Sequence, residues 1–278
     1  MPRVVTLLTD FGHRDGFAGT MKGVILTLAP HVAVVDIAHE LPPQDIRAAA
    51  LVLRGAAPYF PRGTVHVAVV DPGVGTERRA ICIVTERALF VGPDNGVLTW
   101  AAPPTHRHAA FSVENPQYFL PVVSRTFHGR DVFAPVAAHL AAGLEPAFLG
   151  PRLEQITELP WPAVVENDDG SIQGEVIYED RFGNLVTNLE ASILGDFSST
   201  EVWLTIGSSM IPGIVPTYGA VPAGQLAALL NSWGLLEIAV RNGSAARTLG
   251  VGVGAPVTVH LRGKGRSNGP TMANTTQA

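Results

Sequence analysis

The N-terminal stretch Val4–Leu28 reads VVTLLTDFGHRDGFAGTMKGVILTL and decides the fold class. It begins with the run Val4–Leu8, which is apolar and partly β-branched, as is typical of a buried strand. A short polar loop follows, and Phe17–Leu28 then has the composition of a helix. A buried strand that leads directly into a helix is the repeating unit of an α/β domain.

The same alternation continues through the first half of the chain. In Asp45–Ala57, apolar residues recur at helical spacing, and Val132–Ala142 predicts a helix that stops at Gly143. Further strands, apolar enough to be covered on both faces, are expected at Val32–Ile37, Thr64–Val70, Ala80–Thr85 and Ala88–Val91. We therefore predict an N-terminal α/β domain over residues 1–155 with a central, mostly parallel sheet.

The second half of the chain has a different character. Short strands punctuated by Gly, Pro and Asn replace the long helices, which predicts a smaller C-terminal antiparallel β-barrel over residues 163–263. These strands are expected at Ile172–Tyr178, Glu201–Ile206, Leu226–Leu230, Leu235–Val240 and Val257–Leu261. The boundary is placed near residues 151–163, where prolines crowd together, and the polar residues 264–278 are expected to form a disordered tail.

Composition excludes several classes of protein. The 278 residues include 19 Lys and Arg against 24 Asp and Glu, a net charge of −5, and 46% are hydrophobic. Such a chain is too apolar to be disordered and lacks the basic stripe of a nucleic-acid binder. The single cysteine, Cys82, allows neither an internal disulfide nor a multi-cysteine metal site. No apolar run approaches the ~20 residues of a membrane span, and Asp10 comes too early for a signal peptide, so a cytoplasmic protein is expected.

Two polar loops follow predicted strands of the first domain. In open α/β sheets, ligands bind beyond the carboxyl ends of the strands. The first loop, Thr9–Gly16, offers Asp10, whose carboxylate can accept both hydroxyls of a ribose; alternatively, Asp10 or Asp15 caps the following helix. The second, Val69–Arg79, has a proline and glycines that permit close approach to a ligand but lacks the ending of a phosphate loop. Its alternative interpretation is a β-turn closed by an ion pair between Asp71 and Arg78.

Histidines provide the remaining candidates in this domain. His128, in Ser124–Asp131, is a candidate acid, base or polar anchor, whereas Asp131 is also a candidate helix cap. His106 and His108 flank an arginine, but their spacing is poor for one metal ion and no acid is adjacent.

The second domain contributes two polar stretches, Tyr178–Asn188 and Asn231–Gly234, and a carboxylate, Glu237, in an apolar strand. The simplest interpretation makes both stretches ordinary turns and points Glu237 outward. The alternative gives these residues a part in ligand binding.

Taken together, six ordered motifs resemble the S-adenosyl-L-methionine (SAM) hydrolase family, also called SAM hydroxide adenosyltransferases, which is related to fluorinases and chlorinases. The resemblance covers roughly residues 3–262. Its motifs are TDFG (Thr9–Gly12), VDPGVGTERR (Val70–Arg79), GPDNGVLT (Gly92–Thr99), TFHGRDVFAP (Thr126–Pro135), DRFGNLVTN (Asp180–Asn188) and NSWGLLEIA (Asn231–Ala239).

This resemblance implies a fold, an assembly and a reaction. It implies an α/β domain and a β-barrel domain, and a homotrimer in which the substrate binds between one subunit's N-terminal domain and its neighbour's C-terminal domain. The implied reaction cleaves SAM with water to adenosine and L-methionine. The reaction needs no cofactor and no metal. Methionine leaves as a neutral thioether when the bond to the sulfonium sulfur breaks, so no general acid is required.

The resemblance also assigns site residues. Asp71, Arg78 and His128 match the catalytic triad of the hydrolases, and Asp10 matches the acid that holds the ribose hydroxyls. In the barrel, Asn184 and Ser232 match positions that contact the substrate, and Asp180 and Glu237 are weaker matches. Gln44 stands where the fluorinase has a stacking aromatic residue, so Phe11 or another aromatic residue is expected to cover the ligand.

Three alternatives to a SAM hydrolase remain open at this point. A SAM-dependent halogenase is disfavoured, because halogenating relatives carry non-acidic groups in place of Asp71 and an anionic carboxylate repels a halide. A non-catalytic SAM or adenosine sensor would not need the triad. A metal-dependent hydrolase would use Asp10, His13 and Asp15 and would lose activity to chelators.

Overall fold

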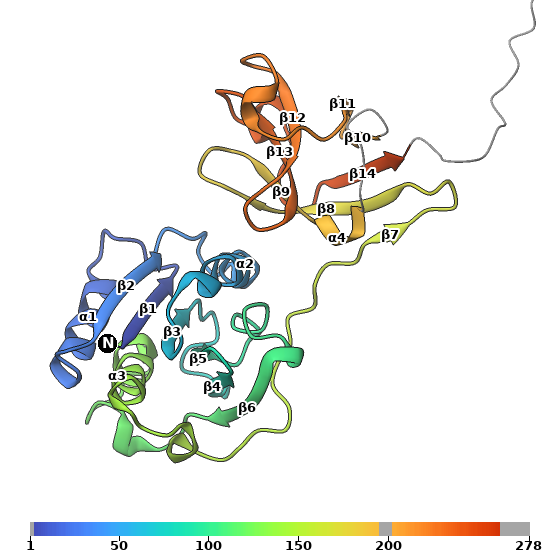
Figure 1. The fold of residues 1–278 in the computed structure, drawn as a ribbon. Coiled ribbons are helices and arrows are strands. Elements are labelled where there is room, and N and C mark those ends of the chain that lie inside the picture. Colours follow the sequence, from blue (N-terminus) through green and yellow to red (C-terminus); the bar gives the residue numbers. More distant parts are fainter. Residues whose placement is uncertain (1–2, 195–201, 262–278) are drawn as a thin grey trace, which may run out of the picture. The chain divides into compact units, whose positions relative to one another are not determined.

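The computed structural model describes residues 3–194 and 202–261, which divide into two compact units at Trp161 and Pro162. The first unit is an α/β domain and the second is built almost entirely of strands (Figure 1). The predicted tail, residues 264–278, lies outside the described residues. Within the described ranges, none of the helices is long and apolar enough to cross a membrane.

The first unit is built on a six-stranded sheet with the order β2-β1-β3-β5-β4-β6. The strands β1, β2, β3 and β5 run parallel to their neighbours in this group, and β4 pairs antiparallel with β5 and β6. The strands are β1 (Val4–Thr9), β2 (Ala33–Ala38), β3 (Thr64–Val69), β4 (Ala80–Thr85), β5 (Ala88–Pro93) and β6 (Arg107–Ser112). The mostly parallel sheet is therefore confirmed.

Helices cover both faces of this sheet, α1 (Phe17–Leu28) and α3 (Ala134–Ala142) on one and α2 (Ile46–Ala56) on the other (Figure 1). Alternate residues of one strand face opposite cores: Leu7 of β1 packs with α1 and α3, whereas Leu8 packs with α2. This explains the continuous apolar runs of the central strands. Asp45 caps α2 by accepting a hydrogen bond from the Ala48 amide at 2.9 Å.

Two expectations for the first unit were wrong in detail. The strand β2 is not covered on both faces, because it is the edge strand of the sheet and leaves Val35 and Asp36 exposed.

The predicted helix Val132–Ala142 begins earlier, as a π-helical turn over Gly129–Phe133 that continues into α3. It ends at Gly143 as predicted, where φ is 112°. π-helical turns inside helices often mark functional sites.

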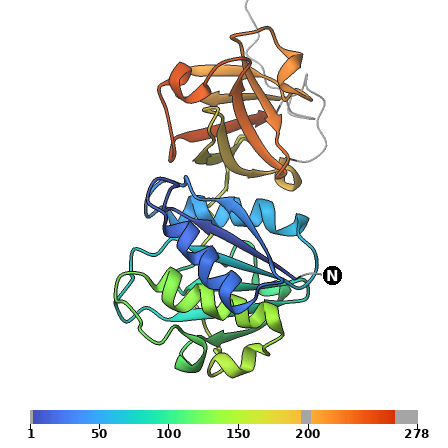
Figure 2. The ribbon, with the colours of Figure 1, turned by 90° about the vertical axis from the view of Figure 1, so that its left-hand side faces the viewer.

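The second unit is an antiparallel, nearly closed sheet (Figure 2). Its strand order is β11-β10-β14-β8-β9-β13-β12, and β7 adds to β8. Two short helices, α4 (Ala191–Leu194) and α5 (Ala245–Leu249), accompany it. The strands are β7 (Val165–Glu166), β8 (Ile172–Glu179), β9 (Leu185–Glu190), β10 (Val202–Ile206), β11 (Ser209–Pro212), β12 (Leu226–Leu230), β13 (Leu235–Val240) and β14 (Pro256–Leu261). The barrel-like fold is confirmed.

Candidate functional site

The first unit brings Asp71, Arg78 and His128 into one hydrogen-bonded cluster. Arg78 Nε lies 2.9 and 3.0 Å from the two carboxylate oxygens of Asp71, and Arg78 Nη2 lies 2.5 Å from Asp71 Oδ2. The same Nη2 lies 2.8 Å from Nδ1 of His128. The ion pair that was the alternative interpretation of Val69–Arg79 is therefore present, but it extends to a histidine fifty positions away in the sequence.

The cluster is shielded from water. The exposed fractions of the Asp71 and Arg78 side chains are 5% and 12%. The guanidinium carbon of Arg78 lies 5.3 Å from the centre of the ring of Phe133, which is fully buried. Partial burial and the positive charge of Arg78 hold the pKa of His128 below its ordinary value of 6.5, in spite of opposing contributions from Asp71 and Asp131.

Close packing of two loops makes this cluster possible. Gly75, in the loop after β3, has a φ of 76° and lies against the loop that carries His128. A Cβ atom at Gly75 would come to 2.4 Å from the carbonyl oxygen of Arg125, so only glycine permits this approach.

The sequence offered Asp131 as a possible helix cap, and this interpretation is wrong. It is completely buried inside the π-helical turn rather than at a helix start. Its carboxylate accepts hydrogen bonds from the Ser124 amide at 2.8 Å and from Nε and Nη2 of Arg130 at 2.6 and 3.0 Å. Asp131 therefore ties down both ends of the segment that carries His128. The sequence shows an acid three positions after a candidate histidine, but it shows neither the burial of that acid nor its partners.

A cavity of about 340 Å³ adjoins the cluster and lies at the carboxyl ends of β1 and β3. Asp10, Asp71 and His128 all line it, together with Phe11, Pro43, Gln44, Val69, Pro72, Val74, Thr126, Phe127 and Gly129. Its volume is within the range of small-molecule sites, about 300–1,000 Å³. This is where α/β sheets bind ligands.

Asp10 does not cap α1, and neither does Asp15. The N-cap of α1 is Gly16, and no side chain caps it. Instead, Oδ2 of Asp10 accepts a hydrogen bond of 2.7 Å from the amide of Gln44, whose φ of 65° is unusual for a residue other than glycine. The capping interpretation is wrong, and Asp10 faces the cavity.

Phe11 lines the same cavity as part of an aromatic group. The rings of Phe11, Phe17 and Phe127 pack edge to face, with centroids 5.2–5.9 Å apart. Phe11 and Phe127 of this group form an apolar wall of the cavity.

In the second unit, Asp180 and Asn184 shape one tight turn. Oδ1 of Asp180 accepts hydrogen bonds from the amides of Phe182 and Asn184, and Oδ2 accepts one of 2.9 Å from Nδ2 of Asn184. A Cβ atom at Gly183, where φ is 79°, would collide with Ser244. These contacts give both residues a structural role in the turn.

Glu237 does not point outward, as the simplest interpretation had it. Only 3% of it is exposed, because β13 is covered on both sides. Its carboxylate accepts hydrogen bonds from the hydroxyl of Tyr218 at 2.7 Å and from Nδ2 of Asn231 at 3.1 Å. Burial raises the pKa of Glu237. Ser232 lies exposed in the turn that Asn231 caps.

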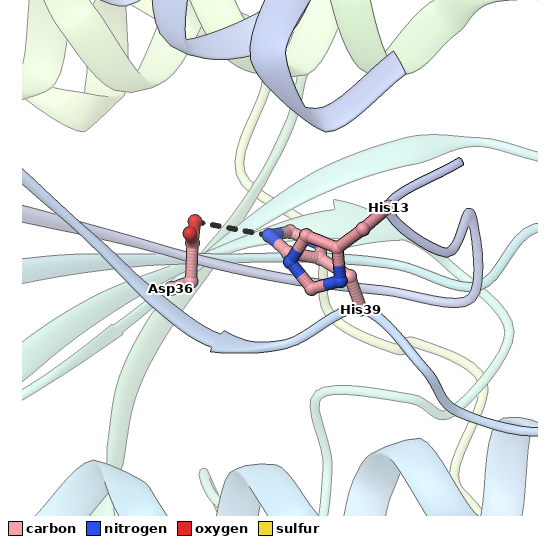
Figure 3. Close-up of side chains that lie close together, drawn as sticks. All are labelled: His13, Asp36 and His39. Atoms are coloured by element: carbon pink, nitrogen blue, oxygen red, sulfur yellow. Dashed lines mark hydrogen bonds and ion pairs between the residues drawn. The ribbon is translucent and has the colours of Figure 1, made fainter. Parts of the chain in front are cut away.

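The proposed metal ligands Asp10, His13 and Asp15 do not come together in the described residues. The described structure instead groups His13 with Asp36 and His39 (Figure 3). His106 and His108 belong to a separate pocket on the surface near β5 and β6.

These features define a two-unit enzyme-like protein: an α/β domain with a shielded Asp–Arg–His cluster beside a small-molecule cavity, and an antiparallel barrel. A family model for the SAM hydroxide adenosyltransferase N-terminal domain matches residues 5–150, and a model for the C-terminal domain of the same family matches residues 174–258. The chain belongs to the SAM hydroxide adenosyltransferase family.

Individual relatives agree with this assignment. A protein named (R)-S-adenosyl-L-methionine hydrolase from Thermus thermophilus is 46% identical over 92% of this chain and 98% of its own length. A fluorinase from Actinoplanes is only 26% identical over 92% of this chain and 97% of its own length. The crystal structure of an uncharacterized conserved protein from Thermotoga maritima matches with a TM-score of 0.85 and 37% identity, covering 92% of this chain and 99% of that one. The prediction that the chain is an enzyme is confirmed.

Proposed function

We propose that this protein hydrolyses SAM to adenosine and L-methionine by displacement at the C5′ carbon of the ribose. The observation that carries the proposal is the shared cavity: Asp71 and His128, both bonded to Arg78, line the same space as Asp10. Family membership supplies the substrate class, and relatives that are 40–46% identical are named hydrolases of SAM.

The displacement needs an oriented oxygen nucleophile and no acid. Methionine departs as a neutral thioether, so catalysis consists of holding a water molecule in line with the C5′–S bond. In the proposed mechanism, the Asp71 carboxylate accepts a hydrogen bond from this water and takes up its proton as the C–O bond forms. The guanidinium of Arg78 stabilises the developing hydroxide by its charge.

His128 completes the site as a hydrogen-bond donor. Its Nδ1 accepts from Arg78, so the neutral ring carries its proton on Nε2. This proton is available to the oxygen of the bound water. His128 therefore orients the nucleophile, whereas the negative charge needed for proton uptake stays on Asp71.

The rest of the cavity is assigned to the nucleoside. Asp10, fixed by the Gln44 amide, is proposed to accept the ribose hydroxyls, and the wall formed by Phe11 to cover the ligand. For the barrel, the resemblance supports Asn184 and Ser232, and more weakly Asp180 and Glu237, as residues that contact SAM. The resemblance also supports a homotrimer with sites at the subunit interfaces, adenosine as the product, and a reaction without cofactor or catalytic metal.

A halogenase is the weaker proposal. Asp71 presents a shielded negative charge to the cavity, and it would repel a halide ion at the position of the nucleophile. The sequence is also further from the fluorinases, at 25–27% identity, than from the hydrolases.

The name of the hydrolase relatives specifies one epimer of the substrate, (R), at the sulfonium sulfur. We propose that this chain shares that preference, because inverting the sulfur centre changes the direction in which the methionine arm leaves a ribose held by Asp10. Turnover of the (R) epimer is expected to exceed that of the (S) epimer.

The decisive experiment incubates the purified protein with each SAM epimer and follows adenosine and methionine by chromatography. In ¹⁸O-labelled water, the label is expected on the 5′ oxygen of adenosine. Halide added in excess is expected to yield no 5′-halogenated nucleoside, and turnover is expected to survive EDTA. Label in methionine, or no adenosine from either epimer, would refute the proposal.

A further inference from the structure

Outside the catalytic cluster, a second group of side chains gathers at the edge of the sheet. His13 lies in the loop after β1, Asp36 belongs to β2, and His39 directly follows β2. One potential ligand atom from each of the three lies within 4.8 Å of the others. Figure 3 shows the imidazoles of His13 and His39 side by side, with the ring of His39 pointing its nitrogen at the carboxylate of Asp36.

We propose that these three side chains bind a divalent transition-metal ion such as Zn²⁺. Two imidazole nitrogens and one carboxylate oxygen are a common ligand set for Zn²⁺, which prefers ligand distances of about 2.0–2.2 Å. Two tetrahedral ligands at that distance are about 3.3–3.6 Å apart. Nε2 of His39 and Oδ1 of Asp36 are 2.9 Å apart, so these two atoms need to separate by only a few tenths of an ångström to hold an ion.

The buried member of the group has the support that a metal ligand needs. The side chain of His39 is completely buried, and its other ring nitrogen, Nδ1, lies 2.8 Å from the hydroxyl oxygen of Thr9. A partner on the second nitrogen fixes the ring orientation and the tautomer of a metal-binding histidine. The His39 side chain is therefore held with Nε2 directed at the position of the ion.

The other side of the site is open and accessible. The exposed fractions of the His13 and Asp36 side chains are 61% and 32%, so an ion can enter from solvent. Oε1 of Glu40 lies 2.9 Å from Nδ1 of His13 and also accepts a hydrogen bond from the His13 amide, so Glu40 holds this histidine in place beside the site.

One neighbouring charge opposes the binding of a cation. Nζ of Lys22, on α1, lies 2.5 Å from Oδ2 of Asp36. This bond leaves Oδ1 directed at His39. The ammonium of Lys22 nevertheless repels an ion bound to Oδ1, because both cations then contact the same carboxylate. Removing Lys22 therefore strengthens binding if Asp36 is a ligand, a result that a purely structural histidine cluster does not give.

The ion would join two elements that lie next to the catalytic cavity. The amide of Gly12 already donates a hydrogen bond of 2.7 Å to the carbonyl of His39, and the same loop carries Asp10. A bound ion adds a second connection between this loop and the edge strand. Its expected role is to stabilise the loop, not to take part in the displacement.

The test titrates EDTA-stripped protein, made without a polyhistidine tag, with Co²⁺ followed by visible absorption and with Zn²⁺ followed by calorimetry. One equivalent is expected to bind, and Zn²⁺ is expected to raise the melting temperature. His13→Ala and Asp36→Asn are expected to weaken binding at least tenfold, and Lys22→Met to tighten it severalfold. His108→Ala, which changes the other surface histidine pair, should bind as the wild type does.

His13 and Asp36 are partly exposed, so their variants are expected to fold, which circular dichroism checks. The absence of saturable binding in the wild type would overturn the proposal. Unchanged affinity in His13→Ala or in Lys22→Met would overturn it as well. Because SAM turnover is measured separately, this result is independent of the proposed hydrolase activity.

Discussion

Nη2 of Arg78 donates a hydrogen bond of 2.8 Å to Nδ1 of His128. A guanidinium cannot accept a hydrogen bond and stays protonated, so Nδ1 of the histidine must be without a proton. The imidazole in this arrangement is neutral. Burial and the charge of Arg78 reinforce this state by lowering the pKa of His128. The cluster is therefore assembled only while His128 is deprotonated.

This relationship predicts the pH dependence of turnover. Protonation of His128 removes the acceptor for Arg78 and places two cations together, so kcat/KM should fall in acid. Because the pKa of His128 is lowered from 6.5, the fall should be centred below pH 6.5, and kcat/KM should stay level from pH 7 to pH 9. A pH profile of kcat/KM checks this. An acid limb centred above pH 7 would contradict the assignment.

Removing a member of the cluster should slow the reaction without unfolding the protein. Asp71→Ala and His128→Ala are each expected to lower kcat by about 10²–10⁴-fold, the usual contribution of a positioned proton acceptor and its partners. The readout is the initial rate of adenosine formation. Wild-type rates in both variants would show that the cluster is not catalytic.

The neighbouring arginines provide a matched control. Arg78 and Arg79 each pair with an aspartate, but Arg79 pairs with Asp94 and its side chain is 46% exposed. Arg78→Ala is expected to reduce kcat as strongly as Asp71→Ala does. Arg79→Ala is expected to leave kcat largely unchanged, because neither Arg79 nor Asp94 lines the cavity. It is expected to lower stability, because it leaves the buried carboxylate of Asp94 without its cation. Equal losses in the two variants would indicate a general effect of charge.

Asp131 is expected to act through His128 as a positioning residue. Asp131→Asn keeps the shape of the side chain but loses the charge that holds Arg130 and the Ser124 amide. Because the segment that carries His128 loosens, kcat should fall by about tenfold or more, with the acid limb of the pH profile shifted further toward acid. An unchanged profile would leave Asp131 with a folding role only.

The order of strands and helices in the first unit followed from the sequence because it depends on local patterns. The run Val4–Leu8 and the helix Phe17–Leu28 are defined by their own apolar residues, and the structure places both within a residue of prediction. The strands β6 and β9 and the short strands β7 and β11 were not predicted. In β9, polar residues such as Asn188 interrupt the apolar pattern, and Asn188 finds its buried partners only in the folded chain. The strand β6 begins with Arg107 and His108, so its sequence lacks a continuous apolar run.

The site was predictable only in part for the same reason. Motif resemblance named Asp71, Arg78 and His128, and the carboxyl ends of the strands indicated where Asp10 would lie. Contacts across long stretches of sequence could not be predicted, including the bond from the Gln44 amide to Asp10 and the burial of Glu237. The same limit hid the group of His13, Asp36 and His39, whose members come from separate segments.

Acid stability should depend on His66. This histidine is buried between the rings of Phe60 and Phe90, and burial lowers its pKa from 6.5 to about 4. Between pH 6.5 and pH 4 the unfolded chain binds more protons than the folded chain, so stability present at pH 7 is lost as the pH falls through this window. The loss amounts to about 3 kcal/mol at most.

Urea unfolding at pH 7 and pH 4.5 measures this effect. In His66→Gln, which cannot titrate, the difference in unfolding free energy between the two pH values should be smaller than in the wild type. Carboxylates contribute equally to both proteins and cancel in the comparison. The same difference in both proteins would contradict the assignment to His66.

Gly75 should be the position where a single methyl group disrupts the site. In Gly75→Ala, the new Cβ would meet the Arg125 carbonyl at 2.4 Å, and a φ of 76° is strained for alanine. The strain alone costs about 1–2 kcal/mol. Relief of the collision moves the segment that carries His128, so kcat should fall together with the melting temperature.

Gly19→Ala is the control. Gly19 lies in α1 with open space around it, and alanine there should stabilise the helix by about 0.5–1 kcal/mol and leave kcat unchanged. Full activity in Gly75→Ala would mean that the close approach of the two loops is not required for the cluster to form.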